Sequence, residues 1–281
     1  GNRAHDPRRA LWRAYMEAVE RADAKVFVVE NVPNFLTSDE GRALIACARS
    51  LGYVVREGAT AGVLNAADYG VPQARKRAFI IGSRVGEILL PEPRGPRRNV
   101  RDAFLRGCHE GDRRIPPKPA GRDLPRVPAS GPELHLGRDP IPSSLARYRA
   151  VPPGGNRFDL HERRPDLTPK CWIRKKSGGT DIFGRLWWDR PSVTIRTEFY
   201  KPEKGRYLHP TEHRPITHWE ALRLQSFPDS FLWTGSKARI AVQIGNAVPP
   251  LLAAAIAENV VAALRKRRRA SARSKAAAAV G

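Results

Sequence analysis

The sequence predicts an α/β protein in which a parallel, doubly wound sheet is joined to a smaller, irregular region. Over the first 85 residues, short apolar segments of strand length alternate with amphipathic segments of helix length. The pattern changes at Pro91, because residues 91–153 hold 13 of the 25 prolines and show no sustained hydrophobic period. Proline interrupts both helices and central strands, so this region is expected to be built from loops.

The first expected element is a helix over residues 9–22. Its apolar positions Leu11, Tyr15, Ala18 and Val19 recur at the spacing of one helical face. That face is expected to pack on the sheet.

Three strands and a second helix complete the first region. Residues 25–30 (KVFVVE) form a short apolar run rich in β-branched side chains, which suits a buried strand. Thr37 with Glu40 matches a capping box, which predicts a helix that runs to about Ser50. The other two strands are expected at 53–57 (YVVRE) and 77–83 (RAFIIGS).

Helical patterns return near the C-terminus. They are expected at 216–226 and 236–244, and again over 251–264, where Pro249 and Pro250 stand at positions that suit a helix start.

The charge balance favours a polyanionic partner. There are 50 Lys and Arg residues against 28 Asp and Glu, a formal net charge of +22. Seven of the basic residues lie between Arg265 and Lys275, so the rest of the chain still carries +15. This excess favours nucleic acid through counterion release. The basic segment itself is expected to be a solvated tail that adds non-specific attraction to DNA.

Several classes of protein are excluded by composition. Cys47, Cys108 and Cys171 are too widely spaced for a disulfide scaffold or a cysteine-rich zinc module, and we expect no metal site. Cys47 lies in an apolar helical stretch and is expected to be a buried small hydrophobe. No apolar run has the length of a membrane span, and the first residues lack the apolar core of a signal peptide. A cytoplasmic protein without membrane contact is therefore predicted.

Three motifs carry polar groups that suit chemistry. Glu30-Asn31-Val32 follows the first strand, at the kind of strand end where open sheets place functional groups. Residues 73–77 (QARKR) lead into the third strand, and Arg75 and Arg77 are spaced by two, so both are expected on one face. Two such guanidiniums can bind a phosphate or the carbonyl edge of a base.

The third motif is residues 245–250 (GNAVPP), a Gly-Asn turn that leads into a helix. Such a turn can present backbone N–H groups to a ligand. Taken singly, each of the three motifs also fits an ordinary strand end, a pair of surface charges or a plain loop.

Together and in this order, the motifs resemble the C-terminal half of the DNA (cytosine-5) methyltransferases. That family has an ENV motif after a strand, a QxRxR motif before a later strand, and a GN-[AS]-V-P motif near its end. Residues 184–195 (GRLWWDRPSVTI) and 209–228, which include Arg214 and Glu220, are similar to further family segments. The resemblance covers about residues 1–262.

The resemblance implies a fold, a reaction and a catalytic set. The fold is an incomplete doubly wound Rossmann-like methyltransferase sheet with a smaller, irregular target-recognition domain. The reaction is methyl transfer from S-adenosylmethionine to C5 of a cytosine that is flipped out of double-stranded DNA. Glu30 is implied to hold the N3/N4 edge of the cytosine, Arg77 to contact O2, and Arg75 to brace the pocket.

The resemblance also implies cofactor and DNA contacts. Asn246 and Val248 are implied to line the S-adenosylmethionine site, and Thr194 is implied to contact the DNA backbone. Four regions follow: a partial catalytic domain (1–90), a target-recognition region (91–190), a motif-bearing segment that returns to the catalytic domain (191–264), and the basic tail (265–281).

Two family motifs do not occur in these 281 residues. None of the three cysteines follows a proline, although the family nucleophile lies in a Pro-Cys pair, and there is no G-x-G sequence for the Gly-rich cofactor loop. We therefore expect a C-terminal fragment or a second subunit that is inactive alone and needs an N-terminal methyltransferase half to supply the nucleophile. The alternative is a non-catalytic, sequence-specific DNA-binding remnant or a regulatory subunit. An unpaired sheet edge is expected in either case.

Overall fold

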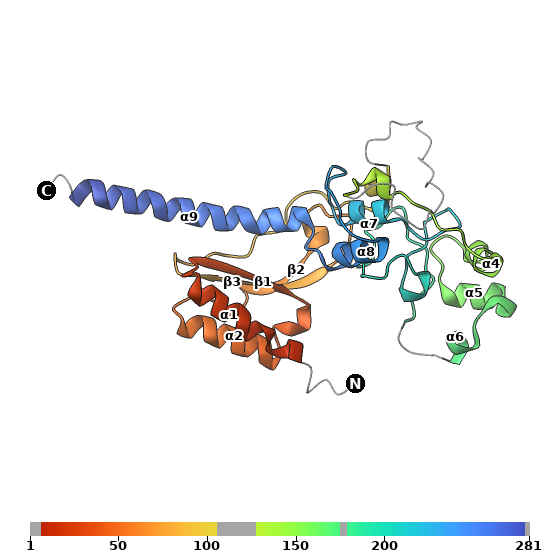
Figure 1. Ribbon diagram of the computed structural model, residues 1–281, viewed down its shortest axis with the longest axis horizontal. Helices are drawn as coiled ribbons and strands as arrows, with labels where there is room; N and C mark the ends of the chain where they lie inside the picture. The colour runs from red at the N-terminus through yellow and green to blue at the C-terminus, as the bar shows by residue number, and fades with distance from the viewer. Residues whose placement is uncertain (1–6, 106–127, 175–178, 279–281) are drawn as a thin grey trace. The chain divides into compact units, whose positions relative to one another are not determined.

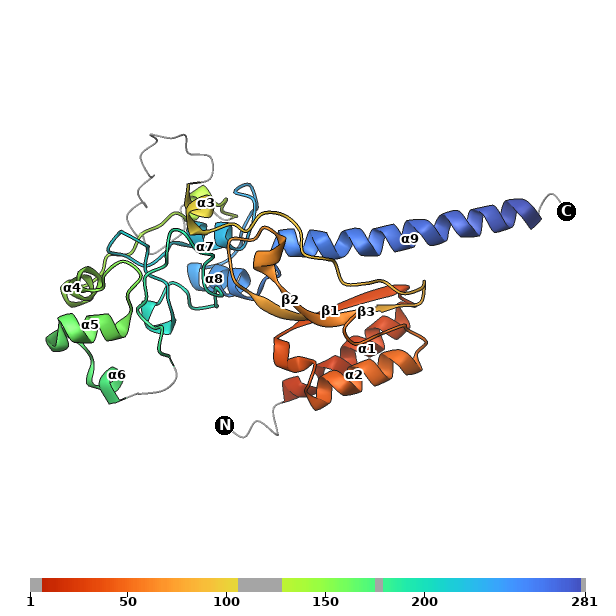
Figure 2. The same cartoon turned by 180° about the vertical axis from the view of Figure 1, so that it is seen from behind.

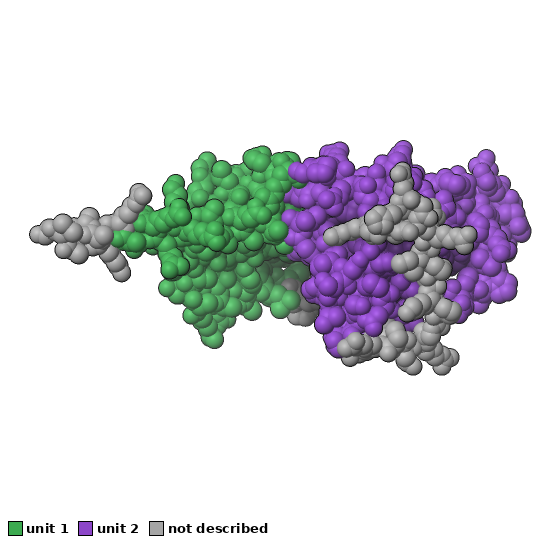
Figure 3. All heavy atoms as spheres, turned by 90° about the horizontal axis from the view of Figure 1, so that it is seen from above, with its two compact units in different colours: residues 1–65, 76–94, 252–281 green, residues 66–75, 95–251 purple. Residues whose placement is uncertain are grey.

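The computed structural model describes residues 7–105, 128–174 and 179–278. The chain divides into two compact units (Figure 3), each assembled from segments that are distant in sequence. Unit 1 comprises residues 1–65, 76–94 and 252–281, and unit 2 comprises residues 66–75 and 95–251. The four predicted regions are a finer division of the chain and stay a prediction.

Unit 1 contains a three-stranded sheet in the order β1 (Val26–Asn31), β3 (Lys76–Ser83), β2 (Ala61–Asn65). Both outer strands pair antiparallel with β3, so the expected parallel pairing is wrong for these strands. Only ten residues separate β2 from β3, and parallel neighbours need a longer crossover. The predicted strand at 77–83 is the central one, and its side chains are buried from Ala78 onward.

The strand predicted at 53–57 does not form a ladder. β2 pairs with β3 only from Lys76 to Ile80; beyond it Val54 forms a single antiparallel bridge with Ser83, and Glu57 forms an isolated bridge with Ala61. Tyr53 and Val55 are nevertheless buried, which explains the alternating pattern that suggested a strand. β2 itself was not predicted, because its sequence (AGVLN) is short and contains a glycine.

Helices lie on both sides of this sheet. Figures 1 and 2 show α1 (Leu11–Arg21) and α2 (Asp39–Ser50) on one side and α9 (Pro250–Ala278) on the other. The helices confirm the α/β class. The core between the sheet and the first two helices contains Met16, Val19, Phe27, Leu44, Ile45, Ala48, Tyr53, Val55, Ala61 and Ile80.

Two details of these helices differ from expectation. Of the predicted face of α1, only Val19 is buried, because Met16 rather than Leu11 or Tyr15 enters the core. The N-cap of α2 is Ser38, whose hydroxyl oxygen accepts from the Gly41 N–H at 3.1 Å.

The predicted cap residues of α2 have other partners. The Thr37 hydroxyl donates to the Asn34 carbonyl, and Glu40 forms an ion pair with Arg9. Both residues lie one position from a true capping box, so the pattern identified the helix but not its first residue.

Unit 2 is built from loops and short helices, in agreement with its high proline content. Its described residues contain isolated β-bridges but no strand of sheet length. Its α-helices are α3 (Val100–Phe104), α4 (Pro142–Ala150), α5 (Arg157–Arg163), α6 (Lys170–Arg174), α7 (His218–Leu224) and α8 (Lys237–Asn246). The last two confirm the helices expected at 216–226 and 236–244.

Short 3₁₀ helices occur in both units. They are Pro7–Ala10 and Pro33–Phe35 in unit 1, and Ala66–Tyr69, Pro132–Leu134, Pro165–Leu167 and Pro202–Lys204 in unit 2.

Buried arginines take the place of a sheet ladder in unit 2. A loop-built core leaves many carbonyl groups without N–H partners, and a guanidinium offers five donors. Arg185 donates to the carbonyls of Tyr148, Val151, His209 and Glu212. Burial lowers the pKa of Arg185 to about 10.

Arg206 plays a similar part. It pairs with Asp181, donates to the carbonyls of Gly154 and Gly155, and its guanidinium lies 3.8 Å from the ring centroid of Trp187.

Among the described residues no single helix is long and apolar enough to cross a membrane. The helices α8 and α9 reach that length and composition only when they are taken together across the bend between them.

Candidate active site

Glu30 and Arg77 form an ion pair within unit 1. Glu30 lies near the end of β1 opposite Phe79 of β3, and Arg77 lies near the start of β3. Arg77 Nε is 3.0 Å from Glu30 Oε1, and the two side chains are 17% and 25% exposed. The pair is therefore formed but open to a ligand.

A hollow of about 830 Å³ in unit 1 is lined by the end of β1, including Glu30 and Asn31. Three aromatic side chains, Trp12, Tyr15 and Phe35, line the same hollow. Tyr15 donates to the Val28 carbonyl at 3.0 Å, and burial raises its pKa, so its hydroxyl remains a donor at neutral pH. The hollow is also lined by Glu40, which is paired with Arg9, so Glu30 is the carboxylate that remains for a ligand beside the aromatic walls, an arrangement that suits a planar heterocycle.

Arg75 makes its contacts inside unit 2 and is 1% exposed. Its guanidinium donates to the Ile195 carbonyl at 3.1 Å and to the Gly245 carbonyl at 2.9 Å. It thereby joins the QARKR, PSVTI and GNAVPP segments. β3 begins only at Lys76, so the period-two argument that placed Arg75 and Arg77 on one face does not apply.

Gln73 is a site residue to which sequence reasoning gave no role. It is fully buried; its Oε1 accepts from the Ile195 N–H at 3.0 Å, and its Nε2 donates to the Leu224 carbonyl at 3.3 Å. The first letter of the QARKR motif was the available signal. Its contacts, 122 and 151 residues away in sequence, could not be foreseen.

Thr194 precedes Ile195, whose backbone is bound by Gln73 and Arg75 in unit 2. Its hydroxyl donates to the Ala74 carbonyl at 2.9 Å, and its own carbonyl accepts from the Tyr207 hydroxyl at 2.9 Å. Burial raises the pKa of Tyr207 to about 12, so this donor stays protonated. The next residue but one, Arg196, is exposed.

The GNAVPP motif ends one helix and starts the next. Asn246 is the last residue of α8 and is exposed, and its side-chain amide makes no hydrogen bond to any residue that the structure describes. Val248 is half-buried, and Pro250 starts α9 as predicted. A Cβ on Gly245 would lie 2.4 Å from the Thr197 backbone nitrogen, so only glycine fits there. The exposed amide of Asn246 can hydrogen-bond a polar ligand.

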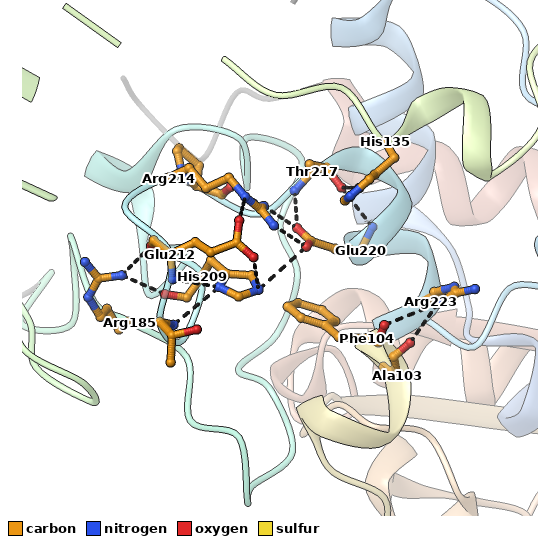
Figure 4. Close-up of polar contacts among 12 residues, drawn as sticks. Ala103, Phe104, His135, Arg185, His209, Glu212, Arg214, Thr217, Glu220 and Arg223 are labelled. Atoms are coloured by element: carbon orange, nitrogen blue, oxygen red, sulfur yellow. Dashed lines mark hydrogen bonds and ion pairs between the residues drawn. The ribbon is translucent and has the colours of Figure 1, made fainter. Parts of the chain in front are cut away.

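A buried polar cluster in unit 2 surrounds the start of α7 (Figure 4). Arg214 binds Glu220 through two hydrogen bonds of 2.8 and 2.7 Å and also contacts Glu212 at 2.7 Å. Burial alone would raise the pKa of Glu220, but the Arg214 guanidinium lowers it to about 2. Glu220 also completes a capping box with Thr217. These contacts fix the helix rather than expose a reactive group.

His135 Nδ1 lies 2.9 Å from the Thr217 hydroxyl, whereas two further histidines near this cluster, His209 and His218, are held by the backbone. His209 Nδ1 accepts from the Thr211 and Glu212 N–H groups, so the ring hydrogen is on Nε2. His218 Nε2 donates to the Lys237 carbonyl at 2.9 Å, and burial lowers its pKa to about 4. With this lowered pKa, the His218 ring is neutral near pH 7.

The described cysteines lie outside these contacts. Cys47 is half-buried in α2 and packs against the unit 1 core, close to expectation, whereas Cys171 is exposed in α6. Cys108 lies outside the described residues. Within the described ranges there is no group of His, Cys, Asp or Glu that could hold a metal ion.

The fold is of the α/β class, and comparison with known proteins identifies the family. The model of the C-5 cytosine-specific DNA methylases matches residues 1–105 and 157–262. The chain belongs to this family.

The most informative relatives are bacterial type II methyltransferases. The chain is 34% identical over 266 residues to M1.HphI of Haemophilus parahaemolyticus, covering 92% of this chain and 62% of that protein. It is 34% identical over 257 residues to M.PspPI of a Psychrobacter species, covering 87% of this chain and 55% of that protein. The chain thus spans little more than half the length of these relatives.

Solved structures support the fold. A prophage-encoded DNA modification methyltransferase from E. coli aligns with a TM-score of 0.63 at 22% identity, over 92% of this chain and 75% of that one. The methyltransferase EhMeth of Entamoeba histolytica aligns with a TM-score of 0.55 at 13% identity, over 93% and 71%. The expected incomplete Rossmann-like methyltransferase fold is confirmed.

Proposed function

We propose that the chain forms part of an enzyme that transfers a methyl group from S-adenosylmethionine to C5 of a cytosine flipped out of duplex DNA. The observation that carries the proposal is the partly exposed Glu30–Arg77 ion pair at the end of β1. Glu30 also lines the hollow that contains Trp12, Tyr15 and Phe35. Because the chain spans only part of its relatives, the activity of the whole enzyme is itself part of the proposal.

The chemistry of the pair matches one edge of cytosine. Along that edge lie an acceptor (O2), a second acceptor (N3) and a donor (the N4 amine), so guanidinium donors at one end and a carboxyl group at the other are complementary to it. Arg77 would donate to O2, and Glu30 would accept from N4 and stabilise the charge that develops at N3. Such preorganised groups supply much of the rate enhancement of an enzyme.

The remaining residues would support this pair. Arg75 would brace the pocket through its bonds to the Ile195 and Gly245 carbonyls. Asn246 and Val248 would line the cofactor site, where S-adenosylmethionine supplies the methyl group. A phosphate accepts hydrogen bonds only, so Thr194 would contact the DNA backbone by turning its hydroxyl from the Ala74 carbonyl to a phosphate oxygen.

The nucleophile would come from another polypeptide segment. C5 of cytosine becomes reactive when a thiolate adds to C6, and the 281 residues contain no Pro-Cys pair. We therefore propose that this chain alone does not methylate DNA and that an N-terminal methyltransferase half completes it. The irregular region 91–190 would select the target sequence; in support, the family model leaves residues 106–156 unmatched.

The proposal is tested by complementation. The purified chain is incubated with duplex DNA and labelled S-adenosylmethionine, with and without an N-terminal half that carries the Pro-Cys and Gly-rich motifs. We expect incorporation only in the mixture, and about 10²- to 10³-fold less of it when the chain carries Glu30→Gln. Incorporation by the chain alone would overturn the two-part scheme. Sequence-specific DNA binding without incorporation in any mixture would favour a non-catalytic binding protein instead.

A further inference from the structure

The C-terminal helix α9 is longer than its role in unit 1 requires. It runs from Pro250 to Ala278 without a break, which corresponds to about 43 Å at 1.5 Å per residue. The expected solvated tail is therefore helical, since Ala, Arg and Lys are strong helix formers. Figures 1 and 2 both show α9 continuing past the strands of unit 1.

The first half of α9 is anchored to unit 1. Leu252, Ala255 and Ile256 are buried. Polar contacts then tie the helix to the segment after β3: Glu258 pairs with Arg94, and the Asn259 side chain donates to the Leu89 carbonyl at 3.0 Å.

Anchoring ends where the basic residues begin. Leu264 is the last half-buried residue, and every described side chain from Arg265 to Ala272 is exposed. Within this stretch Arg267 alone has a described contact with the body of unit 1, donating to the Arg84 carbonyl at 2.7 Å. The rest of the basic stretch is thus held in place without being covered.

The composition of this stretch favours a polyanion over a membrane. Residues 265–269 are five consecutive cations, and at 100° per residue they point to all sides of the helix. There is no acidic residue between Arg265 and Lys275, and alanine is the only apolar type there, so no apolar face could enter a bilayer. Duplex DNA, which carries one charge per ~1.7 Å of axis, matches such a dense basic rod.

We propose that α9 beyond Leu264 is a DNA-binding arm that contacts duplex phosphates outside the methylation site, without reading sequence. Duplex DNA as the partner rests on the proposed function. The arm would raise the affinity for any duplex and the rate of encounter with it. It would not change which cytosine is chosen, because phosphate contacts carry no sequence information.

Bound phosphates would also stabilise the arm itself. Arg265 and Arg269 are one turn apart on the same face, so their like charges repel in the free protein. Phosphates that lie beside them remove this repulsion, and the helix content of the chain should rise when DNA binds.

The test uses the full 281-residue chain and a duplex composed only of A·T pairs. This duplex contains no cytosine, so neither target recognition nor methylation contributes to the result. The arm variant is R265Q/K266Q/R268Q/R269Q, which keeps Arg267 and its contact to Arg84. The matched control is R265K/R268K/R269K, which keeps the charge at every position.

The readout is the slope of log affinity against log salt concentration. Each lost phosphate contact reduces the slope by about 0.9, so the arm variant should lose about 3 to 4 and bind at least tenfold more weakly at low salt. The control should retain the parental slope, and circular dichroism should show added helix with DNA in the parent but not in the arm variant.

Three outcomes would overturn the proposal. The first is an unchanged slope in the arm variant, and the second is an equal loss in the lysine control. The third is reduced binding to phosphatidylserine vesicles with unaltered DNA binding, which would assign the arm to a membrane surface. Failure of the complementation assay for methylation leaves all of these readouts intact, so the two proposals fail separately.

Discussion

Two arginine–glutamate pairs, one in each unit, use the same chemistry for different ends. In unit 2, Arg214 and Glu220 are 12% and 7% exposed and share two short hydrogen bonds, with Glu220 also capping α7. In unit 1, Arg77 and Glu30 are 17% and 25% exposed and share the single contact at 3.0 Å. The first pair has its donors and acceptors engaged by the protein, whereas the second keeps capacity for a ligand.

The two pairs differ in burial and in how many of their hydrogen bonds the protein itself satisfies. A buried pair that loses one partner leaves an uncompensated charge in a medium of low dielectric, which is strongly destabilising. A pair that is partly exposed, as Arg77 and Glu30 are, loses less, because water can reach the remaining charge. The same substitution in the two pairs should therefore affect different properties.

The largest expected effect is on stability, from Glu220→Ala. Loss of this carboxylate leaves the Arg214 guanidinium buried and removes the α7 cap, so unfolding free energy should fall by about 3 to 5 kcal/mol in urea titrations. Glu30→Ala serves as the matched control and should cost less than about 1 kcal/mol. Similar losses in the two variants would contradict the distinction between the pairs.

The next effect is on catalysis, from Glu30→Gln in the completed enzyme. The amide keeps the shape of the carboxylate but not its charge, and we expect methyl incorporation to fall by about 10²- to 10³-fold. The urea midpoint should stay that of the parent. A variant that kept full activity would remove Glu30 from the proposed pocket.

Acid sensitivity should come from unit 2 in two steps. Burial holds the pKa of His218 at about 4, below the usual 6.5, so the unfolded chain binds the extra proton and stability falls as pH drops from about 6.5 to 4. Glu220 keeps a pKa of about 2, so its contribution is present above about 4.5 and is lost as pH falls toward 2. Each step should amount to about 2 to 3 kcal/mol.

The check is the free energy of unfolding, measured from pH 7 to pH 2. His218→Gln should flatten the upper step and leave the lower one. An upper step that persists in this variant would assign it to another group.

The smallest effect is expected from Thr194→Val. This change removes one hydroxyl donor, so duplex binding should weaken about two- to tenfold if Thr194 turns toward a phosphate. Thr194→Ser retains the donor and should bind like the parent. Equal binding by all three proteins would confine Thr194 to its contact with the Ala74 carbonyl.

Sequence patterns predicted most helices and two of the three strands of unit 1. These patterns gave wrong predictions where pairing with another strand determines whether a segment forms a strand. Residues 53–57 have the alternation of a strand but pair with β3 only through the bridge from Val54 to Ser83, whereas the short segment β2 pairs with β3 along its whole length. The N-cap of α2 is Ser38 rather than the predicted Thr37, a difference of one residue that is common at helix ends.

The residue types of the candidate site were readable from the chain, but their surroundings were not. Motif order identified Glu30, Arg75, Arg77, Thr194, Asn246 and Val248 as candidates. The family resemblance implied a bracing role for Arg75 and a base contact for Arg77, but it could not give the burial or the partners of either residue, and it gave Gln73 no role.

By itself, the sequence determined the α/β class, the family and the excess of basic charge, because these depend on residue types, order and local period. The tertiary structure decided which charged groups are buried with their hydrogen bonds made by the protein and which remain accessible to a ligand. Arg75 is sealed by carbonyls 120 and 170 residues away, and Glu220 by the Arg214 guanidinium and the cap of α7. Burial and the saturation of hydrogen bonds depend on such distant partners, and only the folded chain brings them together.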